Sequence, residues 1–354
     1  MNRKAVVMLS GGLDSTLALK MMMEQGIEVL AVSFVSPFCT CTPKKAGCSS
    51  MAVKVARENE VPIEVISKGM EYMRIVENPR FGVGKGINPC IDCRIFMLRK
   101  VRERLDEWGA GFVVTGEVVG QRPMSQHMRA MKLIEKESGL QGILLRPLSA
   151  HLLPPTEPER LGIVDRERLL AIQGRSRQPQ FQLAETLGVD DYLCPAGGCL
   201  LTDPIIAARL RDLFDHNPDY TMTEVRLVRM GRHFRINESL KVIVGRNHQE
   251  NMVLERVTLP GTTRFFLDDD LPGPTALTFG PLGDDDRREV ARMVVRFAKK
   301  VQLPIRVVCD QNAERSFIEV SDSIPEERLD SYRLQPRGKH KGQPPAPKES
   351  TGSS

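Results

Sequence analysis

Residues Ser10 to Ser15, which read Ser-Gly-Gly-Leu-Asp-Ser, have the composition of a phosphate-binding turn. They directly follow the apolar run Ala5 to Leu9, which has the character of a buried strand, and they lead into an amphipathic helix. A glycine-rich turn between a strand and a helix directs several backbone N–H groups and the positive end of the helix dipole toward one point. We therefore expect Asp14 to hold Mg²⁺ or orient pyrophosphate, beside a phosphate site made by Ser10, Gly11, Gly12 and Ser15.

Seven of the eight cysteines fall into three short segments of the chain. The N-terminus carries no secretory signal and no apolar run reaches membrane-spanning length, so we expect a cytoplasmic protein that binds no membrane. Thiols clustered in a reducing compartment favour metal or sulfur chemistry over disulfides. The groups are Cys39, Cys41 and Cys48, then Cys90 and Cys93, then Cys194 and Cys199. The first group lacks a fourth soft ligand, so a metal site, a sulfur relay and a chance spacing all remain open.

Cys90 and Cys93 form a Cys-x-x-Cys pair at a loop-to-helix junction, where the helix N-terminus favours the thiolate. Together with Cys194 and Cys199 they satisfy the four-thiolate count of a structural zinc site. An alternative is a pair of redox-active cysteines that carry a persulfide and then close a disulfide. The residues alone leave both hypotheses open.

The first half of the chain alternates strand-like apolar runs with helix-like amphipathic segments. Repeated β-α-β units predict a parallel sheet with helices on both faces, and ligands of such sheets bind beyond the carboxyl ends of the strands. The phosphate turn and the segments 33–38 and 115–121 all follow predicted strands, so Ser33 and Thr115 are expected at the nucleotide site.

After about residue 216 the pattern changes to short strands around one helix, which predicts a separate, smaller α+β domain. The expected organisation is a nucleotide-binding domain over 1–215, the α+β domain over 216–334 and a disordered basic tail over 335–354. Of the net charge of +5, the tail contributes +3 (four Lys and Arg less one Glu), so RNA binding would need local basic patches. Among single elements we expect a helix over 165–172 and a strand over 253–257.

The hexapeptide SGGLDS resembles the signature of the PP-loop ATP pyrophosphatases, which cleave ATP between the α- and β-phosphates. The segments 115–126 (TGEVVGQRPMSQ) and 145–148 (LRPL) resemble elements that follow in the same order in the tRNA 4-thiouridine synthetase family. This resemblance implies an adenine nucleotide alpha hydrolase-like fold. It also implies that Gly116 approaches the nucleotide and that the substrate pocket is shaped by Gln121, Ser125 and Gln126. The family's preceding RNA-binding domain and appended rhodanese domain are not seen in this sequence.

The segment 88–93, Asn-Pro-Cys-Ile-Asp-Cys, resembles the part of the 2-thiouridylases that holds a catalytic cysteine. In related iron–sulfur-dependent tRNA thiolation enzymes, a Cys-x-x-Cys pair and one distant cysteine hold a [4Fe-4S] cluster whose open iron binds sulfide. This likeness implies Cys90 and Cys93 as cluster ligands, with Cys194 or Cys199 as the third. Cys194, which precedes a proline, is the closer match, and Cys199 is then expected as a catalytic thiol. Zinc and persulfide remain the alternatives.

The second domain contains the segment 242–251, VIVGRNHQEN, which resembles the VGRN-x-x-x-N element of the RNA-binding domain in the ribosome-rescue NFACT proteins. Gly245 would allow a tight turn that exposes Arg246 and Asn247 to phosphates and bases. Arginines between residues 226 and 235 would extend a basic face. The resemblance implies tRNA as the partner of this domain.

These features predict an ATP-dependent tRNA sulfurtransferase. With ATP and Mg²⁺ it would adenylate a pyrimidine carbonyl of tRNA, and sulfur from sulfide or a cysteine desulfurase persulfide would then displace AMP. Two other hypotheses remain. One is a PP-loop ligase or amidating enzyme with a structural zinc, which the clustered thiols disfavour. The other is an RNA-binding module with a degenerate nucleotide site, which the intact Asp14 disfavours.

Overall fold

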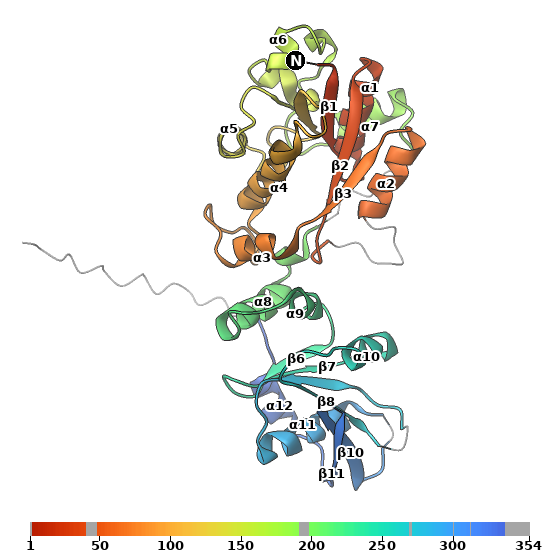
Figure 1. Ribbon diagram of the computed structural model, residues 1–354, viewed down its shortest axis with the longest axis vertical. Coiled ribbons are helices and arrows are strands. Elements are labelled where there is room, and N and C mark those ends of the chain that lie inside the picture. The colour runs from red at the N-terminus through yellow and green to blue at the C-terminus, as the bar shows by residue number, and fades with distance from the viewer. Residues whose placement is uncertain are drawn as a thin grey trace, which may run out of the picture. The chain divides into compact units, whose positions relative to one another are not determined.

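The computed structural model describes residues 2–39, 48–190, 198–268, 271–299, 301–311 and 313–336, apart from the side chains of 48–50. The chain divides into two compact units, residues 1–203 and 204–354 (Figure 1). Cys41, Cys194 and the tail beyond residue 336 lie outside the described residues, and so does the side chain of Cys48.

The N-terminal unit contains a sheet of five parallel strands in the order β3-β2-β1-β4-β5. The central strand β1 is buried on both faces, which explains why its sequence is apolar without alternation. The parallel α/β class expected from the sequence is confirmed. The strands are β1 (Lys4–Met8), β2 (Glu28–Val35), β3 (Ile63–Ser67), β4 (Phe112–Thr115) and β5 (Leu144–Leu145).

Helices lie on both sides of this sheet (Figure 1). Residues of α1, α2 and α7 share one apolar core with Ala5, Val7 and Leu9, which are alternate residues from β1 onward. On another part of the unit α4 packs against α3 and α5. The helices are α1 (Leu13–Glu24), α2 (Cys48–Glu58), α3 (Gly69–Glu77), α4 (Cys90–Arg104), α5 (Met128–Glu137), α6 (Glu157–Arg160) and α7 (Gln178–Thr186).

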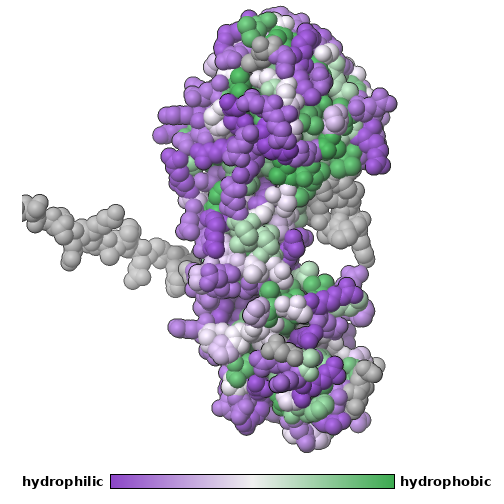
Figure 2. Space-filling model, viewed as in Figure 1, coloured by the Kyte–Doolittle hydropathy of each residue, from purple (hydrophilic) through white to green (hydrophobic). Residues whose placement is uncertain are grey.

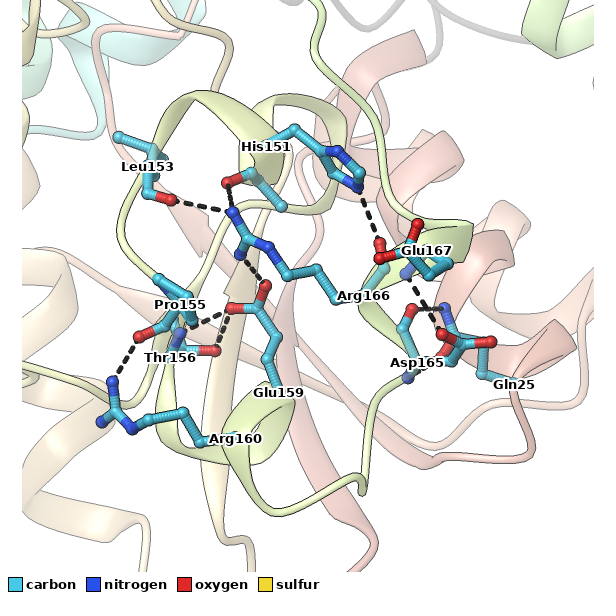
Figure 3. Close-up of polar contacts among 11 residues, drawn as sticks. Gln25, His151, Leu153, Pro155, Thr156, Glu159, Arg160, Asp165, Arg166 and Glu167 are labelled. Carbon is cyan, nitrogen blue, oxygen red and sulfur yellow. Dashed lines mark hydrogen bonds and ion pairs between the residues drawn. The ribbon is translucent and has the colours of Figure 1, made fainter.

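A polar network orders the proline-rich segment that returns from β5 to the first helix (Figure 3). The Arg166 guanidinium donates to the carbonyls of Ala150 and Leu153 at 2.9 and 3.0 Å and pairs with Glu159. The backbone N–H of Asp165 donates to Gln25 Oε1 at 2.7 Å, which connects the segment to the end of α1.

The helix expected over 165–172 is wrong. Only a 3-10 turn forms, over Arg166–Arg168. The N–H groups of Leu170 and Ile172 instead donate to the carbonyls of Pro147 and Leu148, at 2.9 and 2.8 Å. These tertiary bonds hold the chain extended where a helix would have continued.

The C-terminal unit contains an antiparallel six-stranded sheet in the order β11-β10-β8-β9-β7-β6. Apolar residues of α11 pack on one of its faces, together with Val307, Cys309 and Phe265. The strands are β6 (Arg232–Arg235), β7 (Lys241–Val244), β8 (Thr262–Leu267), β9 (Ala276–Phe279), β10 (Ile305–Gln311) and β11 (Glu314–Val320). The helices are α8 (Pro204–His216), α9 (Met222–Leu227), α10 (His248–Glu255), α11 (Asp284–Phe297) and α12 (Glu326–Tyr332).

Two details of this unit differ from the sequence-based expectation. The unit begins at Pro204 and so includes α8, whose buried Asp212 accepts from Arg235 Nε at 2.6 Å and pairs with Lys241 Nζ at 2.8 Å. The strand expected over 253–257 is wrong, because α10 runs through Glu255. Among the described residues, no helix is both long and apolar enough to cross a bilayer.

Candidate functional site

The turn after β1 has the predicted strand–turn–helix geometry. Gly11 has a φ of +75°, a backbone conformation that favours glycine, and Gly12 precedes the first residue of α1. The hydroxyl of Ser15 donates to the Gly12 carbonyl at 2.9 Å and accepts from the backbone N–H of Ser10 at 3.1 Å. These bonds close the turn on itself at the N-terminus of a helix, where an anion is favoured.

Gly116 lies directly against this turn. A Cβ built at Gly116 would lie 2.3 Å from the carbonyl oxygen of Asp14 and 2.6 Å from the N of Ser15. Only glycine allows this approach, which places the segment after β4 beside the phosphate turn. The sequence-based expectation placed Gly116 near the nucleotide; the structure shows that Gly116 lies against the backbone of Asp14 and Ser15.

Both carboxylate oxygens of Asp14 are held by side chains from distant segments. Gln121 Nε2 donates to Asp14 Oδ2 at 2.9 Å, and Arg177 pairs with Asp14 Oδ1 at 3.2 Å. Gln180 Nε2 in turn donates to Gln121 Oε1 at 3.3 Å. The sequence analysis predicted Asp14 and Gln121 but missed Arg177, whose only signal was an Arg- and Gln-rich loop before α7.

Glu117, which directly follows Gly116, lies in a buried ion-pair network. Glu117 Oε2 accepts from Arg146 Nε at 3.1 Å and from Thr115 Oγ1 at 3.3 Å, and Arg94 lies 3.4 Å from Glu117 Oε1. Burial raises the pKa of Glu117, but Arg94 and Arg146 outweigh burial and leave it lowered. Thr115 is thus engaged in this network, and Ser33 is buried within β2.

One cavity of about 250 Å³ joins the phosphate turn to the cysteines. Because Ser10 and three thiols line the same space, the structure brings together residues that the sequence analysis placed in separate motifs. Cys39, from the first cysteine group, also lines it, and its backbone forms a bridge with that of Cys199. The polar lining includes Ser10, Cys39, Lys68, Tyr72, Cys90, Cys93, Arg94, Arg122, Ser125 and Cys199.

Three of the four described cysteines that line this cavity, Cys90, Cys93 and Cys199, have different electrostatic surroundings. Burial alone would raise the pKa of Cys93, but the ammonium of Lys68, which donates to its Sγ at 3.1 Å, and the Tyr72 hydroxyl lower it overall. Burial raises the pKa of Cys90 and raises that of Cys199 to about 11. The geometry therefore favours a thiolate at Cys93.

Lys68 and Tyr72 were not found from the sequence. They lie four residues apart, at the N-terminal end of α3, and the Lys68 Nζ also lies 4.8 Å from the centre of the Tyr72 ring. Such a pair on a helix is an ordinary surface pattern, and only the packing of α3 against α4 turns it toward Cys93.

The cysteine site does not form a metal-binding set in the part of the chain that the structure describes. Within those residues no three or more Cys, His, Asp or Glu side chains are placed to hold one ion. The Cys90 sulfur accepts from Asn88 Nδ2 at 3.0 Å and the Cys93 sulfur from Lys68. Cys194, the expected third cluster ligand, lies outside the described residues.

In the C-terminal unit, the VGRN-x-x-x-N residues mostly contact one another. Asn247 caps α10 by accepting from Glu250 N at 3.0 Å, and Arg246 Nε pairs with the Glu250 carboxylate at 3.1 Å. A Cβ at Gly245 would lie 2.0 Å from Asn251 Oδ1, which accepts from Thr275 N. The VGRN-x-x-x-N element therefore stabilises its own turn. The side chains of Arg246 and Asn247, which were predicted to contact RNA, already form contacts within the protein.

Two family models match the chain. Residues 1–151 match the family described as thiamine biosynthesis protein (ThiI), and residues 231–333 match the NFACT protein RNA binding domain. The resemblances drawn from the motifs of the two units are thereby confirmed.

The curated relatives match about a third of the chain. The chain is 30% identical over 130 residues to the tRNA-specific 2-thiouridylase MnmA 1 of Caldanaerobacter subterraneus subsp. tengcongensis, over 33% of this chain and 36% of that protein. It is 30% identical over 118 residues to the "Probable tRNA sulfurtransferase" of Methanothermobacter thermautotrophicus, over 33% of this chain and 30% of that protein. The chain thus spans about a third of the length of these curated relatives.

Among solved structures, the chain is similar to a 4-thiouridine synthetase–RNA complex with bound ATP. The identity is 23% and the TM-score 0.34, over 52% of this chain and 51% of that chain.

Proposed function

We propose that this protein is an ATP-dependent tRNA sulfurtransferase that forms AMP and pyrophosphate. The observation that carries this proposal is the cavity shared by Ser10 of the phosphate turn and the thiols of Cys90, Cys93 and Cys199. A pyrimidine whose carbonyl oxygen is adenylated at the turn would meet a thiol without leaving the site. Thiolation needs this coupling, because a carbonyl oxygen is a poor leaving group and AMP a good one.

The phosphate turn and its neighbours would carry out the activation. Mg²⁺ is commonly bound through one or two carboxylates together with substrate phosphates, and Asp14 is a carboxylate at the mouth of the turn that suits this arrangement. When bound, the ion would neutralise charge that develops on pyrophosphate. Arg177, now paired with Asp14, is placed to bind a phosphate oxygen once Asp14 binds the ion.

The described thiols support a sulfur carried on the protein. In our proposal the Cys93 thiolate attacks the outer sulfur of a cysteine desulfurase persulfide, becomes Cys93–S–S⁻ and releases the desulfurase thiol. The terminal sulfur attacks the adenylated carbon and AMP leaves. Cys199 then attacks the Cys93 Sγ and its thiol proton passes to the departing sulfur, which releases the thionucleoside and leaves a Cys93–Cys199 disulfide for an external dithiol to reduce.

A [4Fe-4S] cluster held by Cys90, Cys93 and Cys194 is the alternative that the sequence favoured. The described residues include only two of its ligands, Cys90 and Cys93, because Cys194 lies outside them, and the Cys93 sulfur contacts Lys68 and Tyr72. No step is therefore assigned to a cluster, and iron content distinguishes the two routes.

One assay tests the proposed function. The purified full-length protein is incubated with ATP, Mg²⁺, bulk tRNA and a persulfide-loaded cysteine desulfurase, and AMP and thionucleosides are measured by mass spectrometry. We expect tRNA-dependent AMP formation and a thiopyrimidine in the digested tRNA, both absent in Asp14→Asn. AMP formation with an amidated or lysylated nucleoside would instead support a PP-loop ligase, and tRNA binding without ATP cleavage would support a binding module.

A further inference from the structure

A cavity of about 1090 Å³ opens at one end of the C-terminal sheet. Strands β7 and β8 end there and β6, β9 and β10 begin there, so their loops and the end of α11 converge on it. Pockets for ligands of nucleotide size typically measure about 300–1,000 Å³. The volume is therefore sufficient for one nucleotide with part of its backbone.

Four long basic side chains line the cavity, and two of them have acidic partners. Arg246 pairs with Glu250 at 2.5 Å, and Arg306 pairs with Asp268 at 2.8 Å. For Arg232 and Lys299, no carboxylate of the described residues lies within ion-pair distance.

Among the described lining residues, cations therefore outnumber carboxylates. After burial, repulsion from Arg246 and Arg333 contributes most to lowering the pKa of Arg232. An anion bound beside Arg232 would remove that repulsion.

The wall of the cavity is apolar beside these cations. Arg232 lies with its guanidinium carbon 4.5 Å from the centre of the Phe297 ring, and it donates to the Gly245 carbonyl at 3.2 Å. Leu271, 46% exposed, lies on the same wall. Polar and apolar residues are interspersed over this unit in the space-filling view (Figure 2). Nucleobases stack on guanidinium planes and apolar side chains, while phosphates bind the cations.

We propose that this cavity binds one unpaired nucleotide of the tRNA substrate, with Lys299 and Arg232 contacting phosphate and the Arg232–Phe297 stack and Leu271 contacting the base. The inference deepens the proposed tRNA sulfurtransferase and rests on it for the identity of the RNA. The proposal assigns the main RNA contacts to Arg232 and Lys299, which lie outside the motif, and not to Arg246 and Asn247, which the motif indicated.

The test is tRNA binding by the full-length protein, measured by fluorescence anisotropy over a range of salt concentrations and without ATP. Lys299→Ala removes an exposed cation and leaves the core unchanged. We expect it to weaken binding about 3- to 10-fold at low salt and to reduce the slope of log K against log salt by about 0.7–0.9, as loss of one phosphate contact does. Arg232→Gln should have a similar effect.

Arg288→Ala is the matched control, because Arg288 lies on α11 with 66% of its side chain exposed and a weak partner in Asp285 at 3.8 Å. It should leave affinity and slope unchanged. Unchanged binding in both Lys299→Ala and Arg232→Gln would overturn the proposal, and so would an equal loss in Arg288→Ala, which would indicate a diffuse surface charge. Binding to a fully paired RNA duplex should be less affected. If Lys299→Ala weakens binding to tRNA and to the duplex equally, the proposed base contact is wrong.

These results are independent of the proposed activity. A protein that binds tRNA through Lys299 but forms no AMP would retain this inference and refute the sulfurtransferase.

Discussion

The ammonium of Lys68 lies 3.1 Å from the Sγ of Cys93, although 25 positions separate the two residues in the chain. Lys68 directly precedes α3, and Cys93 lies in the first turn of α4. The cation and the positive end of the α4 dipole therefore act on the same sulfur. This relationship distinguishes Cys93 from Cys90 and Cys199, whose pKa values are raised by burial.

Replacing Lys68 should weaken the thiolate without affecting ATP. In Lys68→Met the pKa of Cys93 should rise, because burial then acts without its main opposing charge, so the alkylation rate at neutral pH should fall by up to about tenfold per pKa unit gained. The check is the pH dependence of iodoacetamide labelling at Cys93, mapped by mass spectrometry. Lys68→Arg keeps the charge and should recover most of the rate. An unchanged pH profile in Lys68→Met would show that the contact does not control the thiol.

Gly12, two residues before Asp14, and Gly116, which packs against the Asp14 backbone, should respond differently to replacement by alanine. Gly116→Ala places a methyl group 2.3 Å from a backbone carbonyl oxygen, and backbone cannot yield cheaply, so we expect a loss of about 1–3 kcal/mol or more in unfolding free energy. At Gly12 the nearest atom would lie at 3.5 Å and φ is −93°, so Gly12→Ala should fold normally. Its methyl group would nevertheless crowd the phosphate site and raise the KM for ATP. Chemical denaturation and ATP titration of both variants separate the effects.

The Glu117 network should make stability depend on acid pH. The pKa of Glu117 is lower in the folded protein than its ordinary value of 4.5, so its stabilising contribution is present above about pH 4.5 and is lost as the pH falls through the folded-state pKa. Glu117→Gln leaves the buried Arg146 without this charge partner and should cost about 3–5 kcal/mol. Denaturation midpoints at pH 4 and 7 for both proteins are the measurement. If Glu117→Gln loses as much stability between pH 7 and pH 4 as the wild type, another carboxylate causes the acid sensitivity.

The parts of this protein that sequence analysis predicted are those encoded locally. The run from Ala5 to Leu9 and the turn after it specify a buried strand, a glycine turn and a helix within twenty residues, and the structure has all three. The strand expected over 253–257 failed because Asn247, several residues earlier, begins a helix by capping it.

The missed site residues depend on contacts between segments far apart in the sequence. Arg177 reaches Asp14 across 163 positions, and nothing in its own loop identifies a partner. Cys39 was an ambiguous member of its group until the pairing of its backbone with that of Cys199 placed it in the cavity. Motifs predicted which chemistry to expect, whereas packing decided which residues share one site.

The metal content of the protein decides between the sulfur routes. Because the proposed route carries the transferred sulfur on Cys93 and needs no metal, we expect anaerobically purified protein to be colourless, to contain far less than one iron per chain and to thiolate tRNA with a persulfide donor. Cys93→Ser and Cys199→Ser should each abolish thiolation, and in Cys199→Ser the tRNA should remain covalently attached through Cys93, because the resolving thiol is missing. Cys309→Ser, at a buried core cysteine of the other unit, is the control and should retain activity. A brown protein with about four irons per chain, lost in Cys90→Ser and Cys194→Ser but kept in Cys199→Ser, would establish the cluster instead and make Cys93 a ligand. A colourless protein with one zinc held by the thiols of Cys90, Cys93, Cys194 and Cys199 would assign these cysteines a structural role.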